Sequence, residues 1–248
     1  MKIMAVIPAR YQASRLPGKL MKMLGDKTVI RHTYENTRAT LLFDEVMVVT
    51  DSELIFNEIV QCGGYAVMSK REHQSGSDRI AEAIENIDVD VVINVQGDEP
   101  FVEKEILQKL ISVFKHTGDK DVPVASLMYS MQNEEDITNP NHVKVVVDNN
   151  NFALYFSRGV IPYHRDTERP VVYYKHIGIY GFQKQALMKF TAWPASMLES
   201  LEKLEQLRYL ENGVGIKMVI IKECPIAIDT AEDLEKARIY LENKTTKL

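Results

Sequence analysis

The sequence predicts an α/β fold, a three-layer α/β/α sandwich that carries a smaller strand-rich lobe. In the first half of the chain, short apolar β-branched runs alternate with longer amphipathic segments. The apolar runs are nearly continuous, which is typical of parallel strands that helices cover on both faces. The second half contains more strand-like runs with fewer helices between them, and these runs predict the lobe.

The elements of the first half follow from the spacing of the apolar residues. Glycines 63 and 64 directly follow one amphipathic segment, where glycine commonly ends a helix. We expect strands over residues 2–7, 45–50, 65–68 and 89–96, and helices over residues 28–41, 52–62, 77–86 and 103–116.

The second half is expected to be richer in strands. Residues 148–151 are polar and typical of a hairpin turn. Leucines at every third position over residues 196–212 predict one helix, whose leucines pack in the core or against another subunit. We expect strands over residues 122–131, 143–148, 152–156, 171–182 and 216–221, and a closing helix over residues 230–242.

The composition excludes several classes of protein. The chain has 248 residues, of which 45% are hydrophobic and 26% are charged, and this is enough for a sizeable core. A formal net charge of −5 argues against a general nucleic-acid binder. The chain has two cysteines without a Cys-x-x-Cys motif, a short apolar start and no apolar run of membrane-spanning length. These features predict a cytoplasmic protein without membrane insertion.

A basic loop follows the first predicted strand. Arg10, Arg15 and Lys19 lie within this short segment, and three cations at the carboxyl end of a buried strand suit a nucleoside triphosphate. The loop is not a P-loop, since Ala13 and Leu20 replace the glycine and hydroxyl residue of that motif. The alternative interpretation is a basic, solvated surface loop.

Two aspartates follow other apolar runs. Asp98 stands at the end of a predicted strand and suits Mg²⁺. This ion uses few protein carboxylates when phosphate oxygens complete its coordination shell. Alternatively, Asp98 could only stabilise a turn. Asp229 could cap the closing helix with Glu232 as its partner. Alternatively, Thr230 could cap that helix with Asp233, which would leave Asp229 available as a metal ligand.

Other motifs say less about chemistry. Residues 73–79 lead into a predicted helix and include its start. The first N–H groups of this helix could bind a base or phosphate, or the segment could simply be a capped helix start. The histidines show no zinc-type pairing, and neither a Gly-x-Ser-x-Gly motif nor a Cys/His signature is present.

Several of these segments together resemble the 3-deoxy-manno-octulosonate (Kdo) cytidylyltransferase family, also called CMP-Kdo synthetases. The segments are residues 8–19, 73–76, 94–100, 153–158, 176–181, 204–208 and 229–234. The resemblance implies a nucleotide-diphospho-sugar transferase fold, usually a homodimer, that joins CTP and Kdo to give CMP-Kdo and pyrophosphate with Mg²⁺ for lipopolysaccharide synthesis. It also implies a single domain over residues 1–248, in which 1–120 mainly bind CTP and 121–248 mainly serve sugar binding and dimerisation.

The resemblance also implies a role for individual residues. Arg10, Lys19, Asp98 and Asp229 would be catalytic, and the two aspartates would bind magnesium. The nucleotide-binding set would be Pro8, Ala9, Arg10, Arg15, Lys19, Ser75, Gly76 and Arg79. The sugar-binding set would be Gln96, Arg158, His176, Tyr180, Glu205 and Gln206.

Two alternative functions stay open at this point. One is a cytidylyltransferase for another acid sugar, such as 8-amino-Kdo or a sialic acid. The other is a non-catalytic nucleotide-binding protein on the same fold, which would bind CTP without releasing pyrophosphate. The retained charged residues of the catalytic set disfavour this second alternative.

Overall fold

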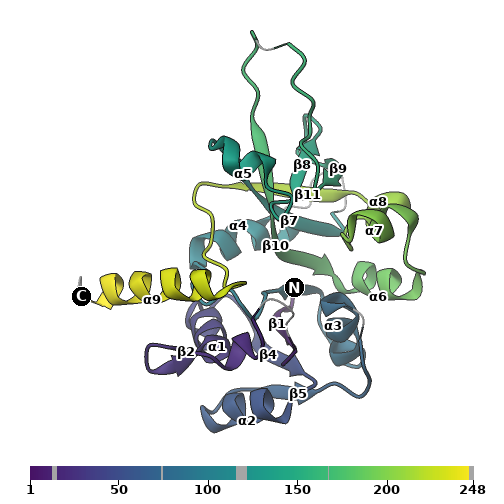
Figure 1. Cartoon of the computed structure of the whole chain (residues 1–248). Helices are drawn as coiled ribbons and strands as arrows, with labels where there is room; N and C mark the ends of the chain where they lie inside the picture. The colour runs from purple at the N-terminus through teal and green to yellow at the C-terminus, as the bar shows by residue number, and fades with distance from the viewer. Residues whose placement is uncertain (13–15, 74, 116–121, 167, 246–248) are drawn as a thin grey trace. The chain divides into compact units, whose positions relative to one another are not determined.

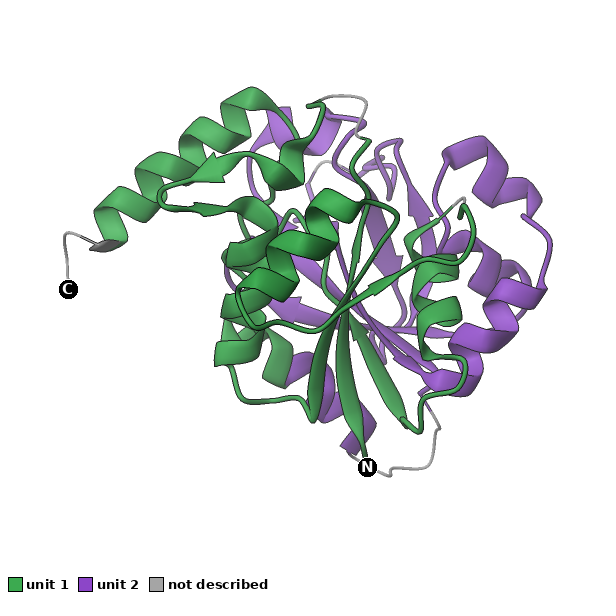
Figure 2. Cartoon of the chain, turned by 90° about the horizontal axis from the view of Figure 1, so that it is seen from below, with its two compact units in different colours: residues 1–108, 225–248 green, residues 109–224 purple. Residues whose placement is uncertain are grey.

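A computed structural model defines the fold of the chain (Figure 1). The structure describes residues 1–12, 16–73, 75–115, 122–166 and 168–245. The chain divides into two compact units, coloured separately in Figure 2. The first unit consists of residues 1–108 and 225–248, and the second consists of residues 109–224.

Parallel strands form the main sheet of the first unit. They are β1 (Ile3–Ala9), β4 (Glu45–Thr50), β5 (Ala66–Met68) and β6 (Val91–Asn94). Their order across the sheet is β6-β1-β4-β5. The register pairs Ala9 with Thr50 and Val6 with Asn94, so the carboxyl ends of these strands meet at one edge of the sheet. The predicted parallel order of this half is therefore confirmed.

Helices pack on both sides of this sheet. They are α1 (Val29–Ala39), α2 (Glu53–Gln61) and α3 (Gly76–Ile84), and α9 (Ala231–Thr245) joins the same unit. Helices α1 and α3 lie on opposite sides of β1 in Figure 1. The chain runs from β1 through β4 to β5 and then returns to β6 on the other side of β1. Because each crossover is right-handed, the change of direction places α3 on the opposite face of the sheet from α1. The buried faces of α1 and α2 carry apolar residues at helical spacing, such as Ile55 and Ile59.

Short elements that the sequence did not predict complete the first unit. They are a 3₁₀-helix, η1 (Lys19–Met21), and a hairpin of β2 (Met23–Leu24) and β3 (Lys27–Thr28). Helix α4 (Lys104–Lys115) contains the boundary between the two units.

The second unit contains a mixed sheet. Its strands are β7 (Val124–Met131), β8 (Lys144–Val147), β9 (Ala153–Ser157), β10 (Tyr173–Gln183) and β11 (Ile216–Ile221). Strand β7 pairs in parallel with β11 and antiparallel with β10, while β8 pairs antiparallel with both β10 and β9. These strands match the predicted ones closely, and the α/β class is confirmed.

The hairpin turn predicted at residues 148–151 joins β8 and β9. The Asp148 carboxylate accepts hydrogen bonds from the backbone N–H groups of Asn150 and Phe152, each at 2.8 Å, and Asn151 has a φ of 58°. Asparagine tolerates this left-handed conformation better than most residues do. The polar side chains of the turn therefore supply its geometry.

The single helix predicted over residues 196–212 is wrong. Helix α7 (Met197–Glu202) ends at Lys203, which is left-handed with a φ of 54°, and α8 (Leu207–Glu211) begins after a short turn. Leucines at every third residue would drift about 60° around one helix at each step, because three residues fall short of a full turn. The break buries Leu204 while Leu201 stays 70% exposed.

Two more helices of the second unit also escaped the prediction. They are α5 (Glu134–Thr138) and α6 (Lys184–Ala192), both short. In the described part of the chain, no helix is both long enough and apolar enough to cross a membrane.

Candidate functional site

A tight turn brings Lys19 to the carboxyl edge of the first unit's sheet. The Lys19 backbone N–H donates to the Leu16 carbonyl at 3.1 Å, and the two central residues are Pro17 and Gly18. Gly18 has a φ of 64° and a ψ of 22°, the conformation that a type II turn requires at its third position. The Pro-Gly pair therefore determines where the lysine side chain starts.

The two predicted metal-binding aspartates come from distant parts of the sequence to the same place. The Ile228 backbone N–H donates to the Asp98 carbonyl at 2.9 Å, which joins the loop after β6 to the segment before α9. Ile228 is fully buried and anchors this contact. Asp229 therefore lies beside Asp98, although the sequence separates them by more than half of the chain.

Lys19 bridges these two carboxylates. Its ammonium group contacts Asp98 Oδ2 closely and lies 2.9 Å from Asp229 Oδ1. The side chains of Lys19 and Asp98 are 15% and 21% exposed, and that of Asp229 is 41% exposed. Burial disfavours the ammonium form, but the two carboxylates outweigh burial and raise the pKa of Lys19. Lys19 is therefore a fixed cation between two carboxylates.

The cap of α9 decides between the two roles that the sequence left open for Asp229, helix cap or metal ligand. The Thr230 hydroxyl accepts a hydrogen bond from the Asp233 N–H at 3.2 Å, and the Asp233 carboxylate accepts from the Thr230 N–H at 2.9 Å. This reciprocal pair is a capping box. Thr230 thus caps the helix, and the Asp229 carboxylate points to Lys19 instead.

The donor set of this cluster fits a magnesium ion. Mg²⁺ commonly takes one or two protein carboxylates and completes its shell with phosphate oxygens and water. Asp98 and Asp229 supply two carboxylates, and Lys19 shows that a cation is accommodated between them. Among the described residues, no group of three or more His, Cys, Asp or Glu side chains could hold a metal without such outside ligands.

Arg79 organises the start of the loop after β1. Its guanidinium donates to the Ala9 carbonyl at 3.0 Å and to Asp51 Oδ2 at 2.6 Å, and its side chain is only 6% exposed. Burial disfavours the charged form of Asp51, but Arg79 and the Tyr11 backbone N–H outweigh burial and lower the pKa of Asp51. Asp51 therefore joins Arg79 to the basic loop.

Ser75 and Gly76 begin α3 beside this arginine. Ser75 caps the helix, with its hydroxyl accepting from the Asp78 N–H at 3.1 Å. A Cβ on Gly76 would lie 3.4 Å from the Pro8 ring, so the helix start packs against the end of β1. The structure thus brings the predicted residues Pro8, Ala9, Ser75, Gly76 and Arg79 into one region of the first unit.

The remaining predicted residues of the first unit are Arg10, Arg15 and Gln96. Arg10 is exposed, and no hydrogen bond or ion pair is assigned to its guanidinium among the described residues. Arg15 lies outside the described residues. Gln96 is half-buried, and its amide donates to the Asn94 side chain at 3.2 Å.

His176, Tyr180 and Gln206 lie together in the second unit. The rings of His176 and Tyr180 are 5.3 Å apart, and the Gln206 amide nitrogen lies 3.5 Å from His176 Nδ1. Burial lowers the pKa of His176 to about 3. Burial also raises the pKa of Tyr180 well above its usual value, assisted by the nearby Glu205 carboxylate. Both side chains are therefore neutral at physiological pH.

Arg158 is engaged in holding the chain together. Its guanidinium donates to the carbonyls of Glu202 at 2.7 Å and Pro140 at 3.1 Å, and its backbone N–H donates to the Glu202 carboxylate at 2.9 Å. No contact between Arg158 and the other predicted sugar-binding residues is assigned in the described part of the chain. Arg158 therefore differs from Tyr180 and Gln206, which contact His176.

Residues outside the predicted site sets also support these regions. Glu82 accepts from the Lys70 backbone N–H at 2.7 Å and contacts His73 Nε2 at 2.9 Å, so it holds the loop that leads to Ser75. Asp51 carries a weak signal in the sequence, because it directly follows a predicted strand. Glu82 carries none, since it sits inside an ordinary amphipathic helix.

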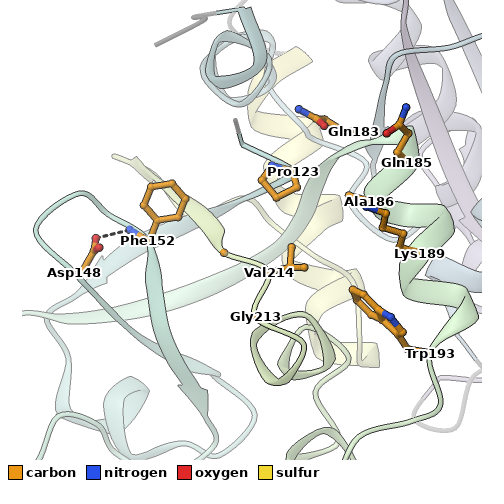
Figure 3. Close-up of a pocket in the computed structure, with 11 residues that line it drawn as sticks. Pro123, Asp148, Phe152, Gln183, Gln185, Ala186, Lys189, Trp193, Gly213 and Val214 are labelled. Atoms are coloured by element: carbon orange, nitrogen blue, oxygen red, sulfur yellow. Dashed lines mark hydrogen bonds between the residues drawn. The ribbon is translucent and has the colours of Figure 1, made fainter. Parts of the chain in front are cut away.

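A separate hollow of about 600 Å³ lies in the second unit (Figure 3). Phe152 and Trp193 lie on different sides of it, and Gln185 and Lys189 of α6 line its rim. The predicted nucleotide-binding and sugar-binding residues are not among its lining residues. This hollow is therefore distinct from both groups described above.

Comparisons with known proteins identify the family of this chain. The model of the cytidylyltransferase family matches residues 4–216. A protein of Flavobacterium johnsoniae named 3-deoxy-manno-octulosonate cytidylyltransferase is 61% identical over 97% of this chain and 99% of its own length. A protein of the same name from Fusobacterium nucleatum is 43% identical over the full length of both chains.

Solved structures show the same relationship. A CMP:2-keto-3-deoxy-manno-octonic acid synthetase complexed with CTP is similar to this chain with a TM-score of 0.92 and 37% identity, covering 98% of this chain and 100% of that one. A cytidylyltransferase from Leptospira borgpetersenii is similar in fold alone, with a TM-score of 0.65 and 18% identity over 98% of this chain and 87% of that one. The chain therefore belongs to the cytidylyltransferase family and, within it, to the 3-deoxy-manno-octulosonate cytidylyltransferases.

Proposed function

We propose that this chain transfers the cytidylyl group of CTP to Kdo, giving CMP-Kdo and pyrophosphate. Family membership supports the reaction. The observation that carries it is the cluster of Lys19 with Asp98 and Asp229, because a cation and two carboxylates at the carboxyl edge of a parallel sheet suit a metal-bound triphosphate.

The base of CTP is assigned to the region around Arg79. Cytosine offers an amino group as a donor and ring atoms as acceptors. The Ala9 carbonyl and the N–H groups at the start of α3 are complementary to that pattern, and Arg79 holds the carbonyl in place. Arg79 is thus a positioning residue in this scheme, and the backbone itself contacts the base.

Arg10 and Lys19 are assigned to the phosphates. Cationic side chains offset the charge that develops on the leaving pyrophosphate, and transfer of this kind depends mainly on positioning and charge stabilisation. Without nucleotide, Lys19 neutralises two carboxylates that would otherwise repel each other. With nucleotide bound, the same ammonium can donate to a phosphate oxygen.

Asp98 and Asp229 are assigned as ligands of Mg²⁺. When bound, this ion supplies charge neutralisation at the phosphates and lowers the pKa of a coordinated hydroxyl. The two aspartates would hold the ion, and Lys19 beside them would supply a second positive charge. Magnesium dependence is tested directly by activity in the presence of a chelator, with Mg²⁺ added back.

The acid sugar is assigned to the predicted sugar-binding residues, of which His176, Tyr180 and Gln206 lie together in the second unit. The 2-hydroxyl of Kdo attacks the α-phosphorus, the bond to pyrophosphate breaks, and the hydroxyl proton is lost. His176 is a poor general base because its pKa is about 3, so its role is to hydrogen-bond the sugar rather than to remove the proton.

Release of pyrophosphate tests this proposal. The protein is incubated with CTP and Mg²⁺, with and without Kdo, and Kdo-dependent release is the expected result. Release with 8-amino-Kdo or a sialic acid but not with Kdo would shift the substrate assignment. CTP binding without release with any of these sugars would favour the non-catalytic alternative. A homodimer and a cytoplasmic location stay predictions, and light scattering in solution tests the first.

A further inference from the structure

An irregularity in strand β10 places His176 and Tyr180. The antiparallel register pairs Ile177 with Leu127 and then Tyr180 with Ser126, so two residues of β10 intervene without counterparts on β7. Such a bulge changes where the neighbouring side chains point. His176 and Tyr180 flank it, and their rings come within 5.3 Å of each other.

The Ser126 hydroxyl fills the inside of this bulge. Ser126 is fully buried, and its Oγ lies 3.1 Å from the Ile177 carbonyl and 3.0 Å from the Ile179 carbonyl. The same oxygen lies 3.0 Å from His176 Nε2. Three polar atoms therefore surround a hydroxyl group that has only one proton to donate.

The position of that proton follows from the two carbonyls. If Ser126 donated to His176 Nε2, its oxygen would face two carbonyl oxygens with no proton between them. If it donates toward the carbonyls instead, its lone pairs are free to accept, and His176 Nε2 must carry a proton. The second arrangement places the single proton between the hydroxyl and the two carbonyl oxygens and so leaves less repulsion than the first, which makes it the favoured one.

The other nitrogen of the ring is then an acceptor. His176 Nδ1 lies 3.5 Å from the Gln206 amide nitrogen, which is too long for a strong hydrogen bond, so the lone pair of Nδ1 can accept from a bound ligand instead. The ring packs against Phe156 at 5.1 Å and Tyr180 at 5.3 Å. Burial keeps the imidazole neutral, with a pKa of about 3.

We propose that Ser126 is a positioning residue that holds His176 as the neutral tautomer protonated at Nε2, so that Nδ1 accepts a hydrogen bond from a hydroxyl group of the acid sugar. The assignment of the sugar rests on the proposed function, whereas the tautomer does not. A neutral acceptor recognises a hydroxyl and cannot pair with the sugar carboxylate, which needs donors.

The first test measures the tautomer by NMR. In protein labelled with ¹⁵N-histidine, long-range ¹H–¹⁵N correlations distinguish a protonated Nε2 from a protonated Nδ1. The His176→Gln variant identifies the signal, and Ser126→Ala removes the hydroxyl. Ser130→Ala is the matched control, because Ser130 lies on the same strand and also faces β10, at Tyr174.

We expect the wild type and Ser130→Ala to show the Nε2–H form without titration between pH 8 and 5. Ser126→Ala should show a mixture of tautomers or an exchange-broadened signal. A protonated Nδ1 in the wild type would overturn the proposal. An unchanged tautomer in a folded Ser126→Ala variant would also overturn it, because a merely structural role would alter stability and leave the ring's protonation as it was.

The second test measures kinetics. Ser126→Ala should raise the KM for Kdo about tenfold and leave the KM for CTP within twofold, since one hydrogen-bond acceptor for the sugar is misplaced. An unchanged KM for Kdo would contradict the role in sugar binding. If the wild type does not turn over Kdo at all, the proposed function fails, and the NMR result still decides whether Ser126 determines the tautomer.

Discussion

The two groups of predicted site residues, one in each unit, handle polar chemistry in opposite ways. In the first unit, a lysine cation stands between two carboxylates that remain partly accessible to water. In the second unit, His176, Tyr180 and Ser126 form a neutral cluster in which burial suppresses charge. One region is organised by opposite charges and the other by hydrogen bonds between uncharged groups.

This difference matches the two substrates of the proposed reaction. A triphosphate carries several negative charges, and cations that are already held in place recognise it strongly. A sugar presents many hydroxyl groups, and neutral donors and acceptors in a dry environment distinguish them by direction. The contrast therefore predicts that substitutions in the first unit act mainly on turnover and CTP binding, and those in the second unit mainly on the sugar.

The largest effect is expected for Asp98→Ala. Removing this carboxylate takes away one of two proposed magnesium ligands, so kcat should fall by about three orders of magnitude or more. Asp26→Ala, a substitution of an exposed aspartate in the same unit, should leave kcat unchanged. Pyrophosphate release measures both. Near-normal turnover in a folded Asp98→Ala protein would contradict the assignment of this cluster.

Lys19→Ala should also reduce kcat, by about two to three orders of magnitude, because a cation near the leaving pyrophosphate is lost. Lys22→Ala changes a half-buried lysine three residues away and serves as the matched control. If added Mg²⁺ fully restored the Lys19→Ala enzyme, the lysine would be only a neutralising partner of the two aspartates.

Asp51→Ala tests whether the base region and the basic loop are coupled. Loss of the carboxylate leaves the buried Arg79 guanidinium with one partner fewer and releases the Tyr11 N–H. The KM for CTP should rise about tenfold while kcat falls less than about threefold. Asp88→Ala, at a side chain that is 95% exposed, should change neither value. Equal losses in both Asp51→Ala parameters would point to a catalytic role instead.

The smallest effect concerns stability at mildly acidic pH. The folded-state pKa of His176 lies below its unfolded value, so the unfolded chain binds a proton that the native protein excludes, and stability falls as pH drops from about 6.5 toward 3. Between pH 7 and 5 this costs at most about 2 kcal/mol, because only the unfolded ring takes up a proton over that range. Urea unfolding of wild type and His176→Gln should show a shallower acid dependence in the variant. Parallel pH profiles would show that His176 protonates normally in the native state.

The sequence by itself determined the features that depend on neighbouring residues. The alternation of apolar runs and amphipathic segments predicted the parallel strands and helices of the first unit, because side-chain burial repeats with the period of each element. The polar turn after Val147 and the Pro17-Gly18 turn before Lys19 were equally readable, since φ and ψ preferences act over a few residues.

Only the tertiary structure decided which side chains meet. Lys19 contacts Asp229 across 210 positions, and Ser126 meets His176 through a register shift that no local pattern encodes. The break at Lys203 likewise depends on which leucines find a core to pack against. Local preferences act within one turn or one strand, whereas these contacts depend on how strands pair and loops close over the whole chain.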